Sequence, residues 1–110
     1  FTYSNFKVNR DEFNLNDTIK VSVDIRNISD INGYETIQLY SSDLYASITP
    51  DIKRLRDFNK LEIKGGELKT IIFDLPVSEL AFANTKNEFV VEPGKFKLAI
   101  DKFSKEITVR

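Results

Sequence analysis

Apolar and polar residues alternate strictly from Thr18 to Asn27, and this pattern constrains the fold more than any other feature of the chain. Branched apolar side chains occupy every second position from Ile19 to Ile25, with charged or small polar side chains between them. Successive side chains of a β-strand point to opposite faces, so a period of two predicts a strand with one face on a core and the other in water. We therefore expect half-buried strands to build the core of this chain.

The same signature returns along the chain, with turn residues between the segments. One such segment runs from Gly33 to Ser41, and another runs from Leu68 to Leu75. Pro76 ends the second one, because proline lacks the amide proton that a sheet ladder needs. The side chains expected to face the core in these two segments are Ile37, Leu39, Ile71, Phe73 and Leu75. Further strands are expected at Tyr3 to Val8, Leu55 to Lys64, Glu88 to Val91, Lys95 to Ile100 and Ile107 to Val109.

Three stretches depart from simple alternation. In the strand that begins at Leu55, we expect Phe58, Leu61 and Ile63 to face inward, and the odd step after Phe58 predicts a bulge at 59–60. The stretch 41–51 loses the alternation and contains a proline, which predicts a long loop. The stretch 77–83 is expected to form a single helical turn. Its inward residues are expected to be Leu80 and Phe82.

Together these segments predict about seven to eight short strands at roughly 8–12-residue spacing. That spacing is typical of an antiparallel sandwich, so the expected fold class is all-β, an immunoglobulin-like β-sandwich. A chain of 110 residues is long enough for one hydrophobic core, and we expect 1–110 to form a single domain.

The composition removes most catalytic chemistry from this chain. There is no Cys and no His, which excludes disulfides, thiolate zinc sites, cysteine nucleophiles and imidazole bases. The 17 acidic residues invite a glycosidase-type carboxylate pair, but they lie at outward strand positions or near turns, where acids keep a surface soluble. We therefore expect no catalytic residue, no metal and no cofactor. A formal net charge of -1 and the lack of a long apolar run predict neither a nucleic-acid nor a membrane partner.

The tyrosines are less well explained by a core than the phenylalanines are. Tyr40 has the opposite parity to Leu39, so it should point away from the core, and an outer face with Tyr40 and Ile72 is a candidate docking surface. Tyr34 and Tyr45 also lack an obvious core position. We therefore assign Tyr34, Tyr40, Tyr45 and Ile72 to a candidate interdomain or ligand surface.

Two weaker patterns carry less information. A basic cluster at 53–60 is balanced by neighbouring acids, which favours a solvated or domain-contacting strand end over a nucleic-acid patch. Its cations are Lys53, Arg54, Arg56 and Lys60. The tripeptides that begin at Asn16 and Asn27 match the N-glycosylation pattern, which also arises by chance.

An ordered series of short motifs resembles the C-terminal fibronectin type III-like domain of family-three glycoside hydrolases. The segment Phe1 to Phe6 is similar to the opening of that domain, and Val21 to Asn27, then Gly33, then Gln38 to Tyr40 resemble its second and third strands. Later matches are 55–61, with Asp57 where glycine is usual, then 75–76, 80–82 and 91–96. Each motif is weak alone, but their order and spacing from Phe1 to about Ile100 make the resemblance specific. The chain departs from the family pattern at Ser41, where valine is frequent, and at Phe89, where tryptophan is frequent.

The resemblance implies a module without catalytic residues. In that family the aspartate nucleophile lies in an N-terminal barrel domain and the acid/base residue usually in the following α/β domain, so neither is carried over to this chain. The implied partners are preceding catalytic domains of the same chain, in an exo-acting β-glucosidase or β-xylosidase of carbohydrate metabolism. The implied role is stability and interdomain packing, and a contact with polysaccharide stays open.

Two alternatives remain open at this point. One is a carbohydrate-binding module with Tyr34, Tyr40 and Tyr45 as a stacking platform for sugars. The other is an immunoglobulin-like adhesion or spacer domain. Sugar specificity, compartment and oligomeric state do not follow from the sequence.

Overall fold

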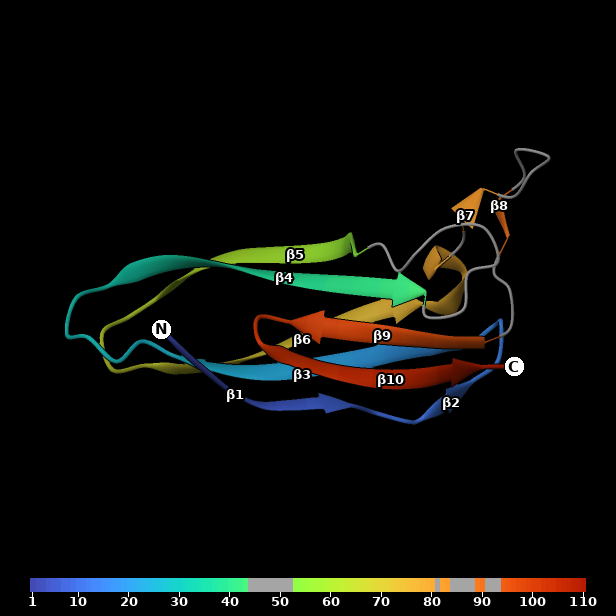
Figure 1. The fold of residues 1–110 in the computed structure, drawn as a ribbon. Helices are drawn as coiled ribbons and strands as arrows, with labels where there is room; N and C mark the ends of the chain where they lie inside the picture. Colours follow the sequence, from blue (N-terminus) through green and yellow to red (C-terminus); the bar gives the residue numbers. More distant parts are fainter. Residues whose placement is uncertain (44–52, 81, 84–88, 91–93) are drawn as a thin grey trace.

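The computed structural model describes residues 1–43, 53–80, 82–83, 89–90 and 94–110 (Figure 1). Almost every element in these ranges is a strand. The strands are β1 (Thr2–Val8), β2 (Glu12–Phe13), β3 (Thr18–Arg26), β4 (Gly33–Asp43), β5 (Arg54–Ile63), β6 (Leu68–Pro76), β7 (Phe82–Ala83), β8 (Phe89–Val90), β9 (Gly94–Ile100) and β10 (Phe103–Val109), and η1 (Val77–Leu80) is one turn of 3₁₀ helix. None of the described helical residues forms a helix with the length and apolar character that a membrane crossing needs.

The strands form two main layers, and in Figure 1 the five-stranded one runs from β5 at the top to β2 at the bottom, with β9 and β10 overlapping β6 and β3 of the other layer. One layer is a three-stranded sheet in the order β1-β3-β6, and the other is a five-stranded sheet in the order β2-β10-β9-β4-β5. The two short strands β7 and β8 pair separately. The expected all-β sandwich is therefore confirmed. Alternation could not reveal that β2 pairs with β10 in parallel, because β2 is only two residues long.

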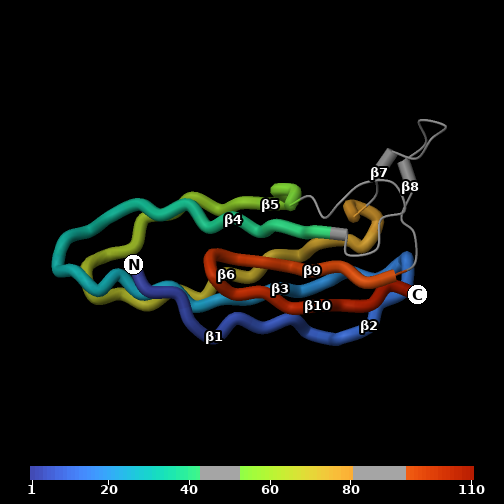
Figure 2. The backbone as a smooth tube through the Cα atoms, in the orientation of Figure 1, coloured from blue at the N-terminus to red at the C-terminus, as the bar shows by residue number. Residues whose placement is uncertain are grey.

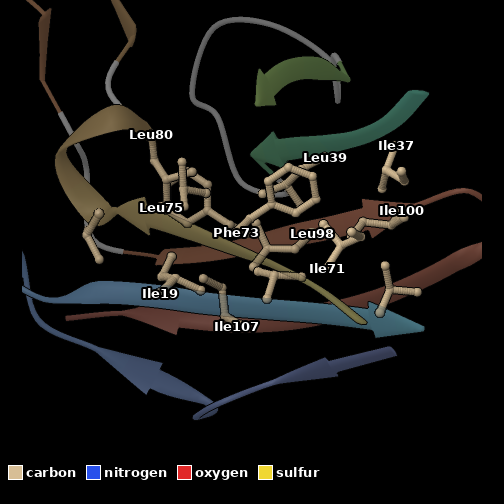
Figure 3. Close-up of a cluster of buried hydrophobic side chains, with 14 of the residues drawn as sticks. Ile19, Ile37, Leu39, Ile71, Phe73, Leu75, Leu80, Leu98, Ile100 and Ile107 are labelled. Carbon is tan, nitrogen blue, oxygen red and sulfur yellow. The ribbon is translucent and has the colours of Figure 1, made fainter. Parts of the chain in front are cut away.

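The core lies between the two layers, as the alternation predicts. The inward side chains of β3 are fully buried, and those of β6 face the same interior (Figure 3). The opposite wall comes from β4, β9 and β10, and burying each such side chain contributes about 1.5–3 kcal/mol. The core side chains labelled in Figure 3 are Ile19, Ile37, Leu39, Ile71, Phe73, Leu75, Leu80, Leu98, Ile100 and Ile107.

The expected orientation of Phe58 is wrong. Its side chain is 60% exposed, because β5 stays in regular register with β4 from Ile63 to Asp57 and Phe58 therefore has the opposite parity to the buried Ile63. The irregularity falls at Arg56 instead of 59–60, since the pairing steps from Leu39 with Asp57 directly to Tyr40 with Leu55.

The helical turn after β6 is confirmed over Val77–Leu80, where both end residues are buried. The loop expected at 41–51 begins later than predicted, because β4 continues through Asp43. The remainder of that stretch and the side chain of Phe82 lie outside the described residues.

At one end of the sandwich, the β3–β4 connection (27–32) and the β5–β6 connection (64–67) lie side by side (Figure 2). The side chain of Asn27, which is only 3% exposed, joins them. Its Nδ2 donates to the backbone oxygens of Ile31 (2.8 Å) and Ile63 (2.9 Å), while its Oδ1 accepts from the backbone N and the Oγ of Ser29. Asn27 is therefore a structural residue, and its amide is already engaged within the fold.

Candidate functional site

The outer face of the β4–β5 pair carries three exposed apolar side chains and the half-buried Tyr40, which together we call the β4–β5 face: Tyr34, Tyr40, Leu55 and Phe58. Tyr34 is 67% exposed, Phe58 60% and Leu55 48%. Tyr40 lies opposite Leu55 in the strand register, and Phe58 lies opposite the next outward residue of β4, Gln38. Because β5 ends the five-stranded sheet, this face lies at an edge of the sandwich.

Tyr40 is held in place by two contacts on this face. Its hydroxyl donates a hydrogen bond to Gln38 Oε1 (2.9 Å), and Lys53 Nζ lies 4.4 Å from the centre of its ring. A cation over an aromatic face is an attractive arrangement, so one face of the ring is already covered. A sugar could stack on that face only by displacing Lys53.

The four residues assigned from the sequence do not form one surface. Tyr34 and Tyr40 share the β4–β5 face but lie six positions apart on β4, which is about 20 Å at the usual strand rise of about 3.3 Å per residue. Ile72 lies on β6, on the outer face of the opposite layer. Tyr45 lies outside the described residues.

Ile72 has polar surroundings on its own layer. It is 61% exposed, and its partner in the register is Ser22. On one side Lys20 forms an ion pair with Asp74 (3.6 Å), and on the other Thr70 Oγ1 donates to Asp24 (2.6 Å). Ile72 is therefore a single apolar side chain on a polar sheet face, and such residues are common on protein surfaces.

The basic cluster at 53–60 is distributed over different environments. Lys53 covers Tyr40, whereas the side chain of Arg56 is half-buried at the β5 irregularity. Arg56 Nε donates to Oγ of the buried Ser41 (2.6 Å). Burial, and to a lesser degree Arg54, lower the pKa of the Arg56 guanidinium. The hydroxyl of Ser41, where the family frequently has valine, thus has a structural use in this chain.

The carboxylates near the outer surfaces act as hydrogen-bond acceptors. Asp24 accepts from Asn5 Nδ2 (2.7 Å) and from Thr70 Oγ1, and these two hydrogen bonds lower the pKa of its carboxyl. A general acid in a glycosidase needs a raised pKa instead. In the part of the chain that the structure describes, no group of three or more potential ligands is placed to hold a metal ion.

Tyr3 is a half-buried phenol on β1. In the β1–β3 register Tyr3 lies opposite Ile25. The β9–β10 hairpin pairs with β4 only from Leu39 onward. Burial raises the pKa of Tyr3, and the carboxylates of Glu35 and Asp101 raise it further. Tyr3 therefore stays protonated through the physiological range.

Sequence reasoning missed Leu55 and Phe58 as members of the β4–β5 face. Counting back from Ile63 in steps of two, without a bulge at 59–60, would have placed Phe58 outward together with Lys60 and Glu62. The inward assignment of Phe58 followed instead from the general preference of phenylalanine for burial.

Two opposed antiparallel layers, a core of alternating side chains and one edge face with exposed aromatics define an immunoglobulin-type β-sandwich module. The module carries no cluster of ligand-type side chains in its described part. The chain belongs to the fibronectin type III-like domain family, whose model matches residues 35–104. The resemblance drawn from the sequence motifs is thereby confirmed.

The relatives of this chain are glycosidases. A β-xylosidase from Formosa agariphila is 36% identical over 96% of the chain and 14% of its own length. The thermostable β-glucosidase B of Acetivibrio thermocellus is 33% identical over the whole chain and 15% of its own length. Among solved structures, a β-glucosidase from Listeria innocua, in complex with gluconolactone, superposes with a TM-score of 0.86 at 35% identity, over 98% of this chain and 16% of that one. The chain thus spans about one seventh of the curated relatives it matches.

Proposed function

We propose that this chain is a non-catalytic accessory domain of an exo-acting β-glycosidase. In this role it stabilises the enzyme by packing against the other domains of the same polypeptide. The proposal is supported by relatives that are β-glucosidases and β-xylosidases and that are several times longer than this chain.

We assign the interdomain contact to the β4–β5 face, and the exposure of Phe58 carries this assignment. A phenylalanine that is 60% exposed next to Leu55 on an edge strand leaves apolar area in water, which a neighbouring domain would cover. Full burial of one such side chain is worth about 1.5–3 kcal/mol. Charged Lys60 and Glu62 continue the face and would form its polar rim.

The test compares Phe58→Ser with Ile72→Ser, both in the isolated chain and in the longer glycosidase that contains it. In the isolated chain, both variants should keep the wild-type free energy of unfolding to within about 0.5 kcal/mol, because both side chains are exposed. In the longer enzyme, Phe58→Ser should lower the Tm of the cooperative unfolding transition, and Ile72→Ser should leave it unchanged.

Equal Tm values for Phe58→Ser and the wild-type enzyme would contradict the assignment of the contact to this face. A longer enzyme that keeps its Tm and its aryl-β-glycoside hydrolysis after deletion of the whole chain would contradict the accessory role itself.

A further inference from the structure

Two adjoining hollows lie beside the β4–β5 face, and the second one extends from the outer side of β4 to the β9–β10 turn and to Tyr3 of β1. The first has a volume of about 150 Å³, and the second has a volume of about 320 Å³. Both are bordered by Lys53 and Asp101, so together they form one continuous depression across β4, β9 and the β9–β10 turn. Tyr40, which lines the second hollow only, also belongs to the β4–β5 face.

The first hollow has a small floor and a cationic rim. Its short side chains are those of Ser42, Ala99 and Ser104, of which Ala99 and Ser104 are paired across β9 and β10, while Ser42 lies opposite Lys97. Short side chains leave room at the sheet surface, and two of them offer hydroxyl groups. Three lysines, Lys53, Lys97 and Lys102, stand around this floor, against the single carboxylate of Asp101. Such a rim favours an anionic group in the hollow.

Lys97 has one acidic cross-strand neighbour on β10. This neighbour is Glu106, which does not line the hollow. Lys102 lies in the turn between β9 and β10, and Lys53 is already turned toward the ring of Tyr40. Lys102 Nζ lies 5.8 Å from the ring centre of Phe103, which also lines the hollow. The three lysines therefore border the hollow from three different elements, and their net positive charge suits a carboxylate or sulfate better than it suits a neutral group.

The second hollow is lined by four neutral side chains with hydrogen-bonding groups, together with the charged Lys53 and Asp101. Thr36 and Tyr3 contribute hydroxyls, Gln38 contributes an amide, and Asp101 contributes a carboxylate that can accept from hydroxyls. Gln38 is oriented by the hydrogen bond from Tyr40. This lining resembles neither an apolar pocket nor a purely ionic one, and it matches the hydroxyl groups of a sugar ring.

From these two linings we propose that the depression binds an acidic oligosaccharide. The anionic group of one sugar lies among Lys53, Lys97 and Lys102, and the adjoining neutral part of the sugar chain lies against Thr36, Gln38 and Asp101. The ligand therefore enters edge-on along the sheet, and stacking on Tyr40 is not required. This site adjoins the β4–β5 face, shares Tyr40 with it, and is present in the isolated chain.

The test uses the isolated chain, titrated with trigalacturonic acid and with cellotriose while the backbone amide resonances are followed by NMR. Trigalacturonic acid should shift the amides of Ser42, Ala99 and Ser104 in a saturable and salt-sensitive manner, and cellotriose should bind at least tenfold more weakly. Lys97→Ala should weaken trigalacturonic acid binding about fivefold, the value of one solvent-accessible ion pair. Thr36→Val, which removes only a hydroxyl, should weaken it to a lesser extent.

Lys64→Ala is the matched control, because it removes the same charge from an exposed position in the β5–β6 connection. An equal loss of affinity in Lys64→Ala and Lys97→Ala would reveal nonspecific attraction and overturn the proposal. Equal affinities for monomeric galacturonic acid and for the trimer would reveal a bare anion site and would also overturn it. Binding of cellotriose as tight as that of trigalacturonic acid would overturn the proposal as well.

Discussion

Replacing Asn27 by alanine should destabilise this sandwich more than any other change of an asparagine within the described residues. The side chain of Asn27 makes four hydrogen bonds that join the 27–32 connection to the end of β5. The bond from Nδ2 to the Ile63 oxygen is buried, so alanine would leave that carbonyl without a partner and without water. The bonds to Ile31 and Ser29 are partly exposed, and water can replace them at a lower cost.

The magnitude follows from these environments. One buried unsatisfied acceptor costs about 1–3 kcal/mol, and each partly exposed hydrogen bond adds about 0.5 kcal/mol. The sum is about 3 kcal/mol, a large share of the roughly 5–15 kcal/mol that holds a domain of this size folded. At about 4 °C per kcal/mol, the Tm should fall by about 12 °C.

The measurement is urea unfolding of the isolated chain, followed by circular dichroism, with Asn16→Ala as the control. Asn16 is exposed, so its replacement should change the free energy of unfolding by less than about 0.5 kcal/mol. Asn27→Asp keeps an acceptor for Ser29 but loses the amide donor to both carbonyls, so near neutral pH it should be at least as destabilising as alanine. If Asn27→Ala unfolds within about 0.5 kcal/mol of wild type, the assignment of Asn27 as the link between the two connections is refuted.

Three further predictions concern positions along the first layer and its turns. Gly65→Ala should lower the free energy of unfolding by at least about 2 kcal/mol in urea titrations, since the new Cβ would lie 2.5 Å from the backbone carbon of Asp30; wild-type stability would contradict the close approach. The pKa of the Asp24 carboxyl is lowered in the folded chain, so its contribution to the free energy of unfolding is complete above the ordinary pKa of about 3.9. That contribution disappears as the pH falls through the lower folded value. The stability difference between wild type and Asp24→Asn should therefore shrink on acidification, and a pH-independent difference would contradict it. The raised pKa of Tyr3 acts in the opposite direction, with stability lost above about pH 10 as the unfolded chain releases a proton that the folded chain retains. Tyr3→Phe should flatten that alkaline decline, and an unchanged decline would refute the assignment.

Local pattern was sufficient for most of the core. In β3 each side chain has the face that its parity predicts, because a strand that is buried on one side leaves no other register open to it. The same holds for the inward residues of β6 and for Ile37 and Leu39 of β4. The order of the motifs was likewise sufficient to predict the fibronectin type III-like family, whose model matches residues 35–104 and so covers the motifs from Gln38 onward.

The candidate surface was less predictable from the sequence. The structure separates Ile72 from Tyr34 and Tyr40, because parity states only that a side chain points outward and does not state from which layer. It also places Lys53 over Tyr40, a contact between residues that are thirteen positions apart and joined by a connection of no regular pattern.

The alternation of the sequence by itself determined the fold class and the core of β3 and β6, and the order of its motifs determined the family of this chain. Only the tertiary structure decided the outer surface, and Phe58 shows the physical reason. Its face depends on where β5 departs from regular pairing, and that place is set by the register with β4, which brings Arg56 against Ser41. Burial of an apolar residue is a local preference, whereas the position of a bulge is a property of two paired strands.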